Sequence, residues 1–248
     1  MEIKRPHVLV ISGFDPSAGA GILADVKTIE ALKAYAFGIV SALTHQDDKR
    51  VYGTSWITLD DIYQQIDILF NRFEIDVCKI GIMESTRALN KVILYLKQRN
   101  PNIKIIVDPV LKSSSGFYFQ ESILRNEWQC ILQKLYLLTP NIDEMKWLSG
   151  VRDPALAAKA WSVLGDILLK GGHSIADKGT DLLFQQGKET RIDNFHKEVF
   201  PKHGSGCILS SAIAAFTALG MALPEACISA KKYAEQALNS NKSLLAYH

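Results

Sequence analysis

Short aliphatic and β-branched runs alternate along this chain with longer segments whose apolar residues recur at helical spacing. We interpret the runs as buried strands, at residues 8–11, 38–43, 77–80, 103–107, 136–139 and 167–169. We interpret the longer segments as helices, at residues 21–35, 59–73, 85–98, 120–133, 142–148, 154–164, 204–219 and 224–240. Repeated strand–helix units predict an α/β fold, with a mostly parallel central sheet covered by helices on both faces. No linker or low-complexity tract divides the sequence, so we expect a single domain over residues 1–248.

Three further strands are expected outside the main alternation. Apolar and polar residues alternate only in part over residues 51–57, which indicates a more exposed strand pair. We expect these residues to form a small lid together with the second strand. Two late strands are expected at residues 181–185 and 190–195. Ligands of open α/β sheets bind where the loops converge at the carboxyl ends of the strands, so we expect the functional residues in those loops.

The composition favours a small-molecule ligand. Charged residues make up 22% of the chain, and the formal net charge of +2 is spread without a basic block, so we expect neither a nucleic acid nor a membrane as partner. No apolar stretch approaches the roughly 20 residues that cross a bilayer. The four cysteines, at positions 78, 130, 207 and 227, are far apart and lack zinc-site spacing. We therefore expect a cytoplasmic protein with reduced thiols.

A glycine-rich turn near the C-terminus is the strongest single indication of chemistry. Gly204, Ser205, Gly206 and Cys207 lead directly into a predicted helix. Unpaired N–H groups and the positive end of the helix dipole make such a turn suited to a phosphate group. Cys207 lies in the electrostatic field of the same helix terminus and could deprotonate the acceptor of a transferred phosphoryl group. A tight helix start with no chemical role is the alternative.

Charged residues follow three other predicted strands. Asn141 and Glu144 come after Pro140, where they could organise a hydrated magnesium near phosphates, or simply form a capping box at a helix start. Asp108 ends its own strand and could join the same charge cluster. Lys170 follows the strand 167–169, where its ammonium could cover a phosphate, although a surface lysine is the commoner explanation. The joint presence of these groups and the glycine turn favours phosphate chemistry.

The loop after the first strand, residues 13–21, is rich in small residues. Such a loop is either a flexible turn or a place where a flat ligand approaches the backbone closely. Its glycines lack the order of the dinucleotide-binding fingerprint, and the sequence contains no mononucleotide loop ending in Gly-Lys-Ser or Gly-Lys-Thr. The common nucleotide motifs are therefore absent.

Six segments together resemble one known family. The motifs are Gly13-x-Asp15-Pro16-Ser17-Ala18-Gly19-Ala20-Gly21 with Ala24-Asp25-Val26-Lys27-Thr28, Lys79-Ile80-Gly81, Asp108-Pro109-Val110, Thr139-Pro140-Asn141-x-x-Glu144, Leu169-Lys170-Gly171-Gly172-His173 and His203-Gly204-Ser205-Gly206-Cys207. In this order they resemble the hydroxymethylpyrimidine/phosphomethylpyrimidine kinases of thiamin biosynthesis, which are members of the ribokinase superfamily. The resemblance extends from residue 8 to about residue 240.

The resemblance implies a ribokinase-like three-layer sandwich with a small lid, and ATP-dependent phosphorylation of a pyrimidine hydroxymethyl group and then of its monophosphate. It implies a pyrimidine pocket at Ala20, Gln46 and Val110, to which we add Asp15 of the first loop. It implies a magnesium and phosphate motif at Asn141 and Glu144, to which we add Asp108 as a second metal carboxylate. Lys170 would bind phosphate, Gly204, Ser205 and Gly206 would form the anion hole, and Cys207 would be the catalytic base. The implied cofactors are ATP and Mg²⁺.

The sequence departs from the family pattern in several places near these sites. Ala18 stands where glycine is usual, Ser205 where threonine is usual, and Asp47 and Asp48 replace smaller or amide residues; the usual glycine-rich tail after the last helix is missing. These departures bear on the acceptor, the second phosphorylation and efficiency rather than on the fold. Family members often form dimers through the lid, so we expect a homodimer in which Trp56 and Ile57 help to bury an edge.

Three alternatives remain open at this stage. A pyridoxal kinase on the same scaffold would also phosphorylate a flat heteroaromatic alcohol. A non-catalytic relative would bind the pyrimidine without turnover. A third alternative is an acyl- or thiol-transfer enzyme with Cys207 as nucleophile, for which the nearby His203 is the candidate base.

Overall fold

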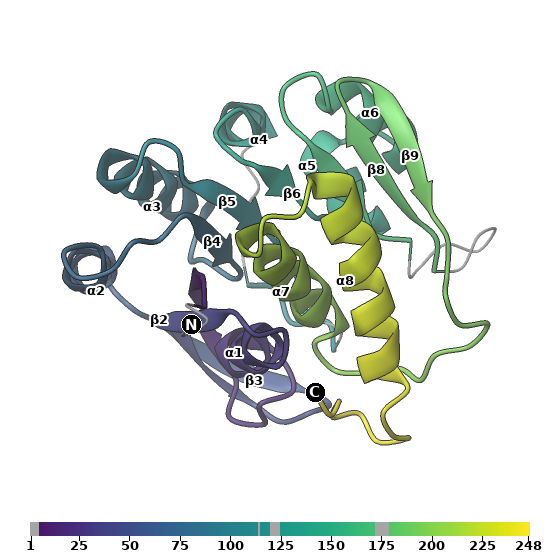
Figure 1. Ribbon diagram of the computed structural model, residues 1–248, viewed down its shortest axis with the longest axis horizontal. Coiled ribbons are helices and arrows are strands. Elements are labelled where there is room, and N and C mark those ends of the chain that lie inside the picture. The colour runs from purple at the N-terminus through teal and green to yellow at the C-terminus, as the bar shows by residue number, and fades with distance from the viewer. Residues whose placement is uncertain (1–4, 114, 120–124, 172–178) are drawn as a thin grey trace.

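A single sheet crosses the structure from one side to the other, as the computed structural model in Figure 1 shows. The structure describes residues 5–113, 115–119, 125–171 and 179–248. The sheet has nine strands in the order β3-β2-β1-β4-β5-β6-β7-β8-β9. The strands are β1 His7–Phe14, β2 Tyr35–Gln46, β3 Val51–Trp56, β4 Val77–Ile80, β5 Lys104–Val107, β6 Leu137–Leu138, β7 Ile167–Leu169, β8 Asp181–Gln185 and β9 Lys188–Ile192.

The centre of the sheet is parallel and its two edges are antiparallel. The strands from β2 to β7 pair in parallel, whereas β3 pairs antiparallel with β2, and β8 and β9 complete the other edge antiparallel. The predicted mostly parallel sheet is confirmed. The carboxyl ends of the parallel strands therefore meet along one edge of the molecule, where the loops that follow them come together.

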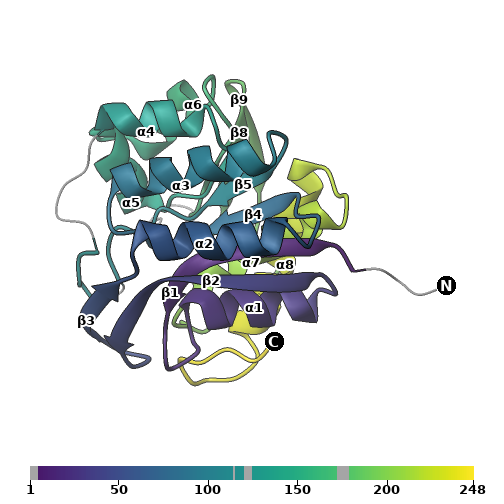
Figure 2. The ribbon, with the colours of Figure 1, turned by 90° about the vertical axis from the view of Figure 1, so that its left-hand side faces the viewer.

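Eight helices cover the two faces of the sheet within the described residues. The helices α1 (Gly21–Ala31), α7 (Ser205–Ala218) and α8 (Leu223–Leu238) pack on one face. The other face carries α2 Leu59–Phe70, α3 Thr86–Arg99, α4 Arg125–Leu132, α5 Ile142–Ser149 and α6 Pro154–Trp161. Figure 2 shows α2, α3 and α4 side by side on that second face. The result is the predicted three-layer arrangement.

Strand alternation divides the core between the two faces. On β1, Leu9 and Ile11 belong to the cluster under α2 and α3, whereas Val8 and Val10 belong to the cluster under α1, α7 and α8. All four side chains are fully buried. Burial on both faces explains why β1 reads as a continuous apolar run rather than as an alternating one.

The lid differs in detail from its prediction. Strand β2 has twelve residues rather than the six that were predicted. Its residues from Tyr35 to Leu43 pair with β1, and its residues from Ala42 to Gln46 pair with β3. Two apolar side chains of this region, Leu43 and Tyr52, are 45% and 64% exposed. The homodimer through the lid remains a prediction.

Several predicted boundaries were wrong. Helix α1 ends at Ala31 rather than near residue 35, because Lys33 adopts a positive φ of 68° and the Tyr35 N–H then donates to the Pro6 carbonyl at 2.8 Å, which begins β2. Strand β9 ends at Ile192 rather than at residue 195. Residues 120–124 of the predicted helix 120–133 lie outside the described residues.

No helix in the described part of the chain combines the length and apolarity that a membrane crossing requires.

Candidate active site

The glycine turn and the first loop are in direct backbone contact. Gly204 caps α7 with a φ of +77°, and a Cβ built on it would lie 2.1 Å from the Gly19 carbonyl oxygen. The first helical hydrogen bond of α7 is donated by the Ile208 N–H to Gly204, so the N–H groups of residues 205–207 precede the helical ladder. They form the dipole-positive end of a 14-residue helix. This geometry fits a bound phosphoryl group.

Asp15 organises the first loop. Its carboxylate accepts hydrogen bonds from the Ser17 N–H at 2.8 Å and the Ala20 N–H at 2.9 Å, and from the Ser17 hydroxyl at 2.9 Å. His203 Nε2 lies 2.8 Å from Asp15 Oδ2. Burial alone would raise the pKa of Asp15, but these hydrogen bonds from His203, Ser17 and Ala20 lower it below its ordinary value. Asp15 is 1% exposed, so the structure gives it a role in loop organisation, and its predicted contact with substrate remains a prediction.

The His203 contact also bears on the alternative in which Cys207 is a nucleophile. That mechanism needs a histidine base within reach of the sulfur. In the structure the His203 ring is directed to Asp15, which fixes the first loop against the glycine turn. The arrangement therefore favours a loop-positioning role for His203 over the role of base to Cys207.

Lys170 lies at the centre of the predicted charge cluster. Its ammonium is 2.6 Å from Asp108 Oδ1 and 3.8 Å from Glu144 Oε2. A Cβ built on Gly206 would lie 3.3 Å from the Lys170 ammonium, so the cluster adjoins the glycine turn. Burial would lower the pKa of Lys170, but Asp108 and Glu144 raise it above its ordinary value. The structure thus brings a permanently charged cation beside the anion turn.

Asn141 and Glu144 form the capping box that the sequence offered as one interpretation. The Asn141 N–H donates to Glu144 Oε2 at 2.7 Å, and the Glu144 N–H donates to Asn141 Oδ1 at 2.8 Å. Burial raises the pKa of Glu144 to about 7, against the attraction of Lys170. The second carboxylate oxygen of Glu144 is not part of the capping box. Capping therefore does not preclude a role for Glu144 near a metal ion.

Cys207 is partly buried in the first turn of α7. The Gly21 N–H, at the start of α1, lowers the pKa of this thiol, so the N-termini of α1 and α7 both bear on it. Burial nevertheless raises the pKa of Cys207 to about 12, and the nearby Lys79 lowers it only in part. In the ligand-free protein desolvation thus outweighs the attraction of Lys79.

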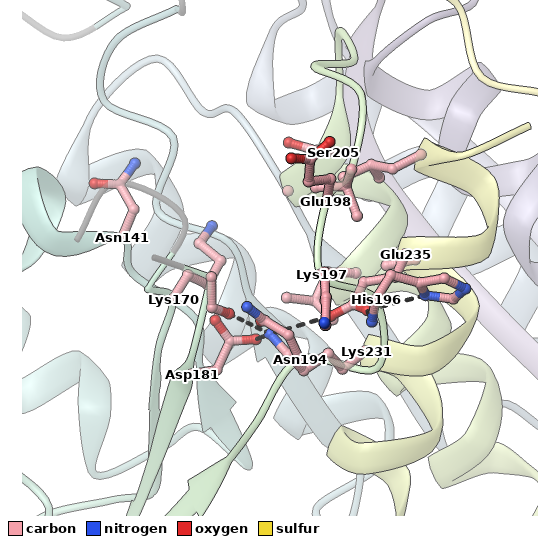
Figure 3. Close-up of a pocket in the computed structure, with 16 residues that line it drawn as sticks. Asn141, Lys170, Asp181, Asn194, His196, Lys197, Glu198, Ser205, Lys231 and Glu235 are labelled. Atoms are coloured by element: carbon pink, nitrogen blue, oxygen red, sulfur yellow. Dashed lines mark hydrogen bonds and ion pairs between the residues drawn. The ribbon is translucent and has the colours of Figure 1, made fainter. Parts of the chain in front are cut away.

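A cavity of about 600 Å³ opens beside Lys170 and the glycine turn. Figure 3 shows Asn141 and Lys170 on one side of it, and His196 and Glu235 on the other. Its walls come from the residue after β7, the start of β8, the start of α7, one face of α8 and residues 194 and 196–199. The volume lies within the range of roughly 300–1,000 Å³ that is usual for small-ligand sites.

The far wall of this cavity did not emerge from the sequence. Glu235 accepts hydrogen bonds from the N–H groups of Phe195 and His196 at 2.9 and 2.8 Å, and Lys231 lies 3.0 Å from Asp181. The Glu235 contacts hold Phe195 and His196 against α8, and the Lys231 contact joins α8 to the start of β8. The four-residue spacing of Lys231 and Glu235 on a helix was the only available signal, and it is typical of many solvent-exposed helices.

A second buried pair was also missed. Lys79 on β4 and Asp25 on α1 are both fully buried, and the ammonium lies 2.8 Å from each carboxylate oxygen. The signal was present, since Lys79 stands within an otherwise apolar buried strand. Both residues belong to the motifs quoted above, but no role was assigned to them.

The predicted site residues fall into two groups in the structure. Lys170, Asp108, Glu144 and Asn141 adjoin the glycine turn of residues 204–207, which in turn packs against Ala20. Gln46 at the end of β2 and Val110 after β5 lie at the same edge of the sheet, and their contact with substrate remains a prediction. Gly172 and His173 of the predicted lysine motif lie outside the described residues.

Comparison with known sequences gives a consistent result. A family described as phosphomethylpyrimidine kinase matches residues 15–248. A hydroxymethylpyrimidine/phosphomethylpyrimidine kinase of Bacillus subtilis is 30% identical, with 97% of this chain and 92% of the relative covered. That of Escherichia coli is 33% identical over 86% of this chain and 83% of the relative. A thiamine biosynthesis bifunctional protein of Geobacter sulfurreducens is 32% identical, and the chain spans 49% of its length.

Solved structures of two kinases share the fold. A phosphomethylpyrimidine kinase of Clostridium difficile has a TM-score of 0.78 at 30% identity, with 94% of this chain and 99% of that chain covered. A pyridoxal kinase of Staphylococcus aureus in complex with pyridoxal has a TM-score of 0.83 at 25% identity, with 95% and 88% covered. The same pyridoxal kinase has also been solved with AMP-PCP and pyridoxal.

Proposed function

This chain belongs to the phosphomethylpyrimidine kinase family, and we propose that it phosphorylates 4-amino-5-hydroxymethyl-2-methylpyrimidine and then its monophosphate, using ATP. The observation that carries the proposal is the junction of the glycine turn with the Lys170 cluster. A helix N-terminus, a partly buried cation and two carboxylates meet beside a cavity of about 600 Å³. Phosphoryl transfer depends mainly on positioning and on neutralising charge, and these groups supply both.

We assign the phosphate contacts as follows. The N–H groups of Ser205, Gly206 and Cys207 would bind the γ-phosphoryl oxygens, because they precede the helical ladder of α7. Lys170 would add a full positive charge 3.3 Å from the position of a Cβ on Gly206. The partial charges of these N–H groups and the full charge of Lys170 are in place before substrate binds, so the site needs little reorganisation in the transition state.

Two carboxylates fit a magnesium ion that is held mainly by phosphate oxygens and water. Asp108 and Glu144 are buried oxygen donors on either side of Lys170, and Mg²⁺ is commonly bound through one or two carboxylates plus substrate phosphates. When bound, the ion would neutralise charge on the transferring group. Glu144, with a pKa of about 7, would be favoured in its ionised form by the cation.

Cys207 would accept the proton of the acceptor hydroxyl. The proton passes to sulfur while the hydroxyl oxygen bonds to the γ-phosphorus and the bond to ADP breaks. With a pKa of about 12 in the ligand-free protein, the thiol would first release its own proton to solvent, and the resulting thiolate would then take the hydroxyl proton. The first loop, held by Asp15 and His203, would place Ala20 beside the flat acceptor ring, with Gln46 and Val110 completing the pocket.

A pyridoxal kinase activity is the second candidate. The similarity to the pyridoxal kinase of Staphylococcus aureus, with a TM-score of 0.83, supports it. The higher identity to pyrimidine kinases, at 30–33%, favours the pyrimidine.

Product analysis separates the two. The purified protein is incubated with ATP, Mg²⁺ and either the pyrimidine alcohol or pyridoxal, and the products are identified by mass spectrometry. We expect pyrimidine monophosphate and then diphosphate. Phosphorylation of pyridoxal alone would refute the proposed acceptor, and pyrimidine binding without turnover with either compound would indicate a non-catalytic relative.

A further inference from the structure

The backbone around Lys170 is held on both sides. The Lys170 N–H donates to the Pro140 carbonyl at 2.9 Å, which continues the parallel pairing of β6 and β7. The next N–H along the chain, that of Gly171, donates to a side chain instead, to Asp181 Oδ1 on β8, at 2.8 Å. The peptide bond after Lys170 therefore takes a carboxylate rather than a strand carbonyl as its acceptor.

Gly171 also lies in close contact with the start of β8. A Cβ built on Gly171 would lie 1.6 Å from the Thr180 carbonyl oxygen, and the Gly179 N–H donates to the Gly171 carbonyl at 3.0 Å. The two backbones are packed too closely for either to move alone. The position of residues 179–181 therefore decides where the backbone after Lys170 lies.

Asp181 is held in turn by α8. Its other oxygen, Oδ2, lies 3.0 Å from the Lys231 ammonium, which also donates to the Gly179 carbonyl. Asp181 and Lys231 are only 4% and 5% exposed, so these contacts rather than water orient both side chains. Figure 3 shows Asp181 below Lys170, with Lys231 on the neighbouring helix. One carboxylate thus joins α8 to the peptide bond that follows Lys170.

Stability alone is a weak explanation for this buried pair. Apolar residues of similar volume often serve a core as well as a buried ion pair, or better. Apolar side chains could not, however, accept the hydrogen bond of the Gly171 N–H, and a buried N–H without a partner is costly. The pair is therefore best explained by the backbone that it holds in place.

The side chain at the end of this backbone is the Lys170 ammonium. It lies 2.6 Å from Asp108 Oδ1 and 3.3 Å from the position of a Cβ on Gly206, at the junction to which we assign the phosphoryl group. A misplacement of about 1 Å is enough to slow a transfer reaction strongly. Efficient transfer therefore requires a backbone that does not shift at Lys170.

We propose that Asp181, oriented by Lys231, is a positioning residue for Lys170, which it holds through the Gly171 N–H beside the transferred phosphoryl group. This role rests on the proposed kinase function. Asp181 accepts the hydrogen bond from Gly171, and Lys231 fixes the carboxylate from α8. Neither residue contacts the reacting atoms.

Two double variants separate the hydrogen bond from the charge. Asp181→Leu with Lys231→Met, the Leu/Met variant, removes the acceptor of the Gly171 N–H and leaves neither member of the pair as an unpaired charge. Asp181→Asn with Lys231→Gln, the Asn/Gln variant, also removes both charges. Its amide side chains can still accept from Gly171 and donate to the Gly179 carbonyl.

The matched control is Asp166→Asn. Asp166 precedes β7 and accepts a hydrogen bond at 2.7 Å from Gln185, the last residue of β8. The control therefore removes a hydrogen-bonded carboxylate at the opposite end of the same two strands. Its kcat should stay within about twofold of the parent.

Crystal structures of the variants give the first readout, which needs no substrate. We expect the Lys170 ammonium of the Leu/Met variant to shift by about 1 Å or more from its place beside Asp108, and that of the Asn/Gln variant to keep its parental position. An unshifted ammonium in the Leu/Met variant would overturn the proposal, even with a lowered melting temperature. A merely structural pair would stabilise the fold without placing Lys170.

Phosphoryl transfer gives the second readout. The Leu/Met variant should lose about 10- to 100-fold in kcat, while KM for the acceptor stays within about twofold of the parent, since the proposed acceptor pocket lies at the first loop. The Asn/Gln variant should recover most of the rate. A parental kcat in the Leu/Met variant, or an equal loss in both double variants, would refute the role of the Gly171 hydrogen bond.

Failure of the kinase function would be distinguishable from failure of this role. If the parent transfers no phosphoryl group while the Lys170 ammonium shifts as expected, the kinase function fails and the positioning of Lys170 by Asp181 stands. If the Leu/Met variant does not fold, Lys231→Met alone decides, since it frees the Asp181 carboxylate from α8. The Lys170 ammonium should shift in that variant too, and its parental position there would overturn the proposal.

Discussion

Replacing Gly204 by alanine should separate the glycine turn from the first loop. The residue has a φ of +77°, which costs an L-residue roughly 1–2 kcal/mol. The new Cβ would also lie 2.1 Å from the Gly19 carbonyl oxygen and 2.7 Å from the Ala20 Cα, both backbone atoms that cannot rotate away. Overpacking of this kind costs roughly a further 1–3 kcal/mol. We therefore expect Gly204→Ala to lower the free energy of unfolding by about 2–5 kcal/mol.

The chain provides a matched control at Gly187. This residue has nearly the same φ, +78°, but a Cβ on it would meet no atom within 4 Å. Gly187→Ala should therefore cost only the conformational part, about 1–2 kcal/mol. The difference between the two variants isolates the contact between the loops.

The assay is urea denaturation of both variants, together with phosphoryl transfer. Displacing the turn by about 1 Å should lower the transfer rate of Gly204→Ala by about 100-fold, whereas Gly187→Ala should keep its rate within about twofold. Equal destabilisation of the two variants, with equal rates, would refute the close packing of the first loop on the turn.

Three further predictions concern titratable groups. The folded pKa of Glu144 is about 7 against an ordinary 4.5, so the folded state binds more protons than the unfolded state between these pH values. The free energy of unfolding should therefore fall by about 3 kcal/mol as the pH rises through this range, relative to Glu144→Gln. Equal pH dependence of the free energy of unfolding, measured with urea, in the parent and in Glu144→Gln would contradict this. Cys207→Ala should lower kcat by about 100-fold, and Cys207→Asp should retain more of it if the role is that of a base; an inactive aspartate variant with a trapped sulfur adduct in the parent would indicate a nucleophile. Asp15→Asn should destabilise the protein at neutral pH but not at a pH below the folded pKa of Asp15, since that pKa is lowered; thermal melts that differ equally at all pH values would count against this.

The central layers of the fold follow from local sequence patterns, whereas the edges and boundaries depend on longer-range contacts. Strand β4 was predicted with its observed bounds, because four buried residues bounded by a polar residue and a glycine leave little ambiguity. The end of α1 was not, because the positive φ of Lys33 has no signal in its residue type. The end of β9 was predicted at residue 195 rather than at Ile192. In the structure the Phe195 N–H donates to Glu235 on α8 instead of pairing in the sheet.

The site divides in the same way. Residues that follow parallel strands were predicted to converge, since topology brings strand ends together, and Lys170 does meet Asp108. Roles that depend on side-chain direction were less accessible. The carboxylate of Asp15 binds its own loop and His203, contacts that the sequence did not predict. Lys79 was conspicuous in its apolar strand, but its pairing with Asp25 depends on how α1 packs on β4, which the sequence of neither element specifies.

The most direct test of the central claim is a crystal structure of the protein with Mg²⁺, AMP-PCP and the pyrimidine alcohol. The account predicts the γ-phosphoryl group on the N–H groups of Ser205, Gly206 and Cys207, beside Lys170, with the acceptor hydroxyl between that group and the Cys207 sulfur. A γ-phosphoryl group bound away from this turn, or a pyrimidine whose hydroxyl points away from Cys207, would contradict it.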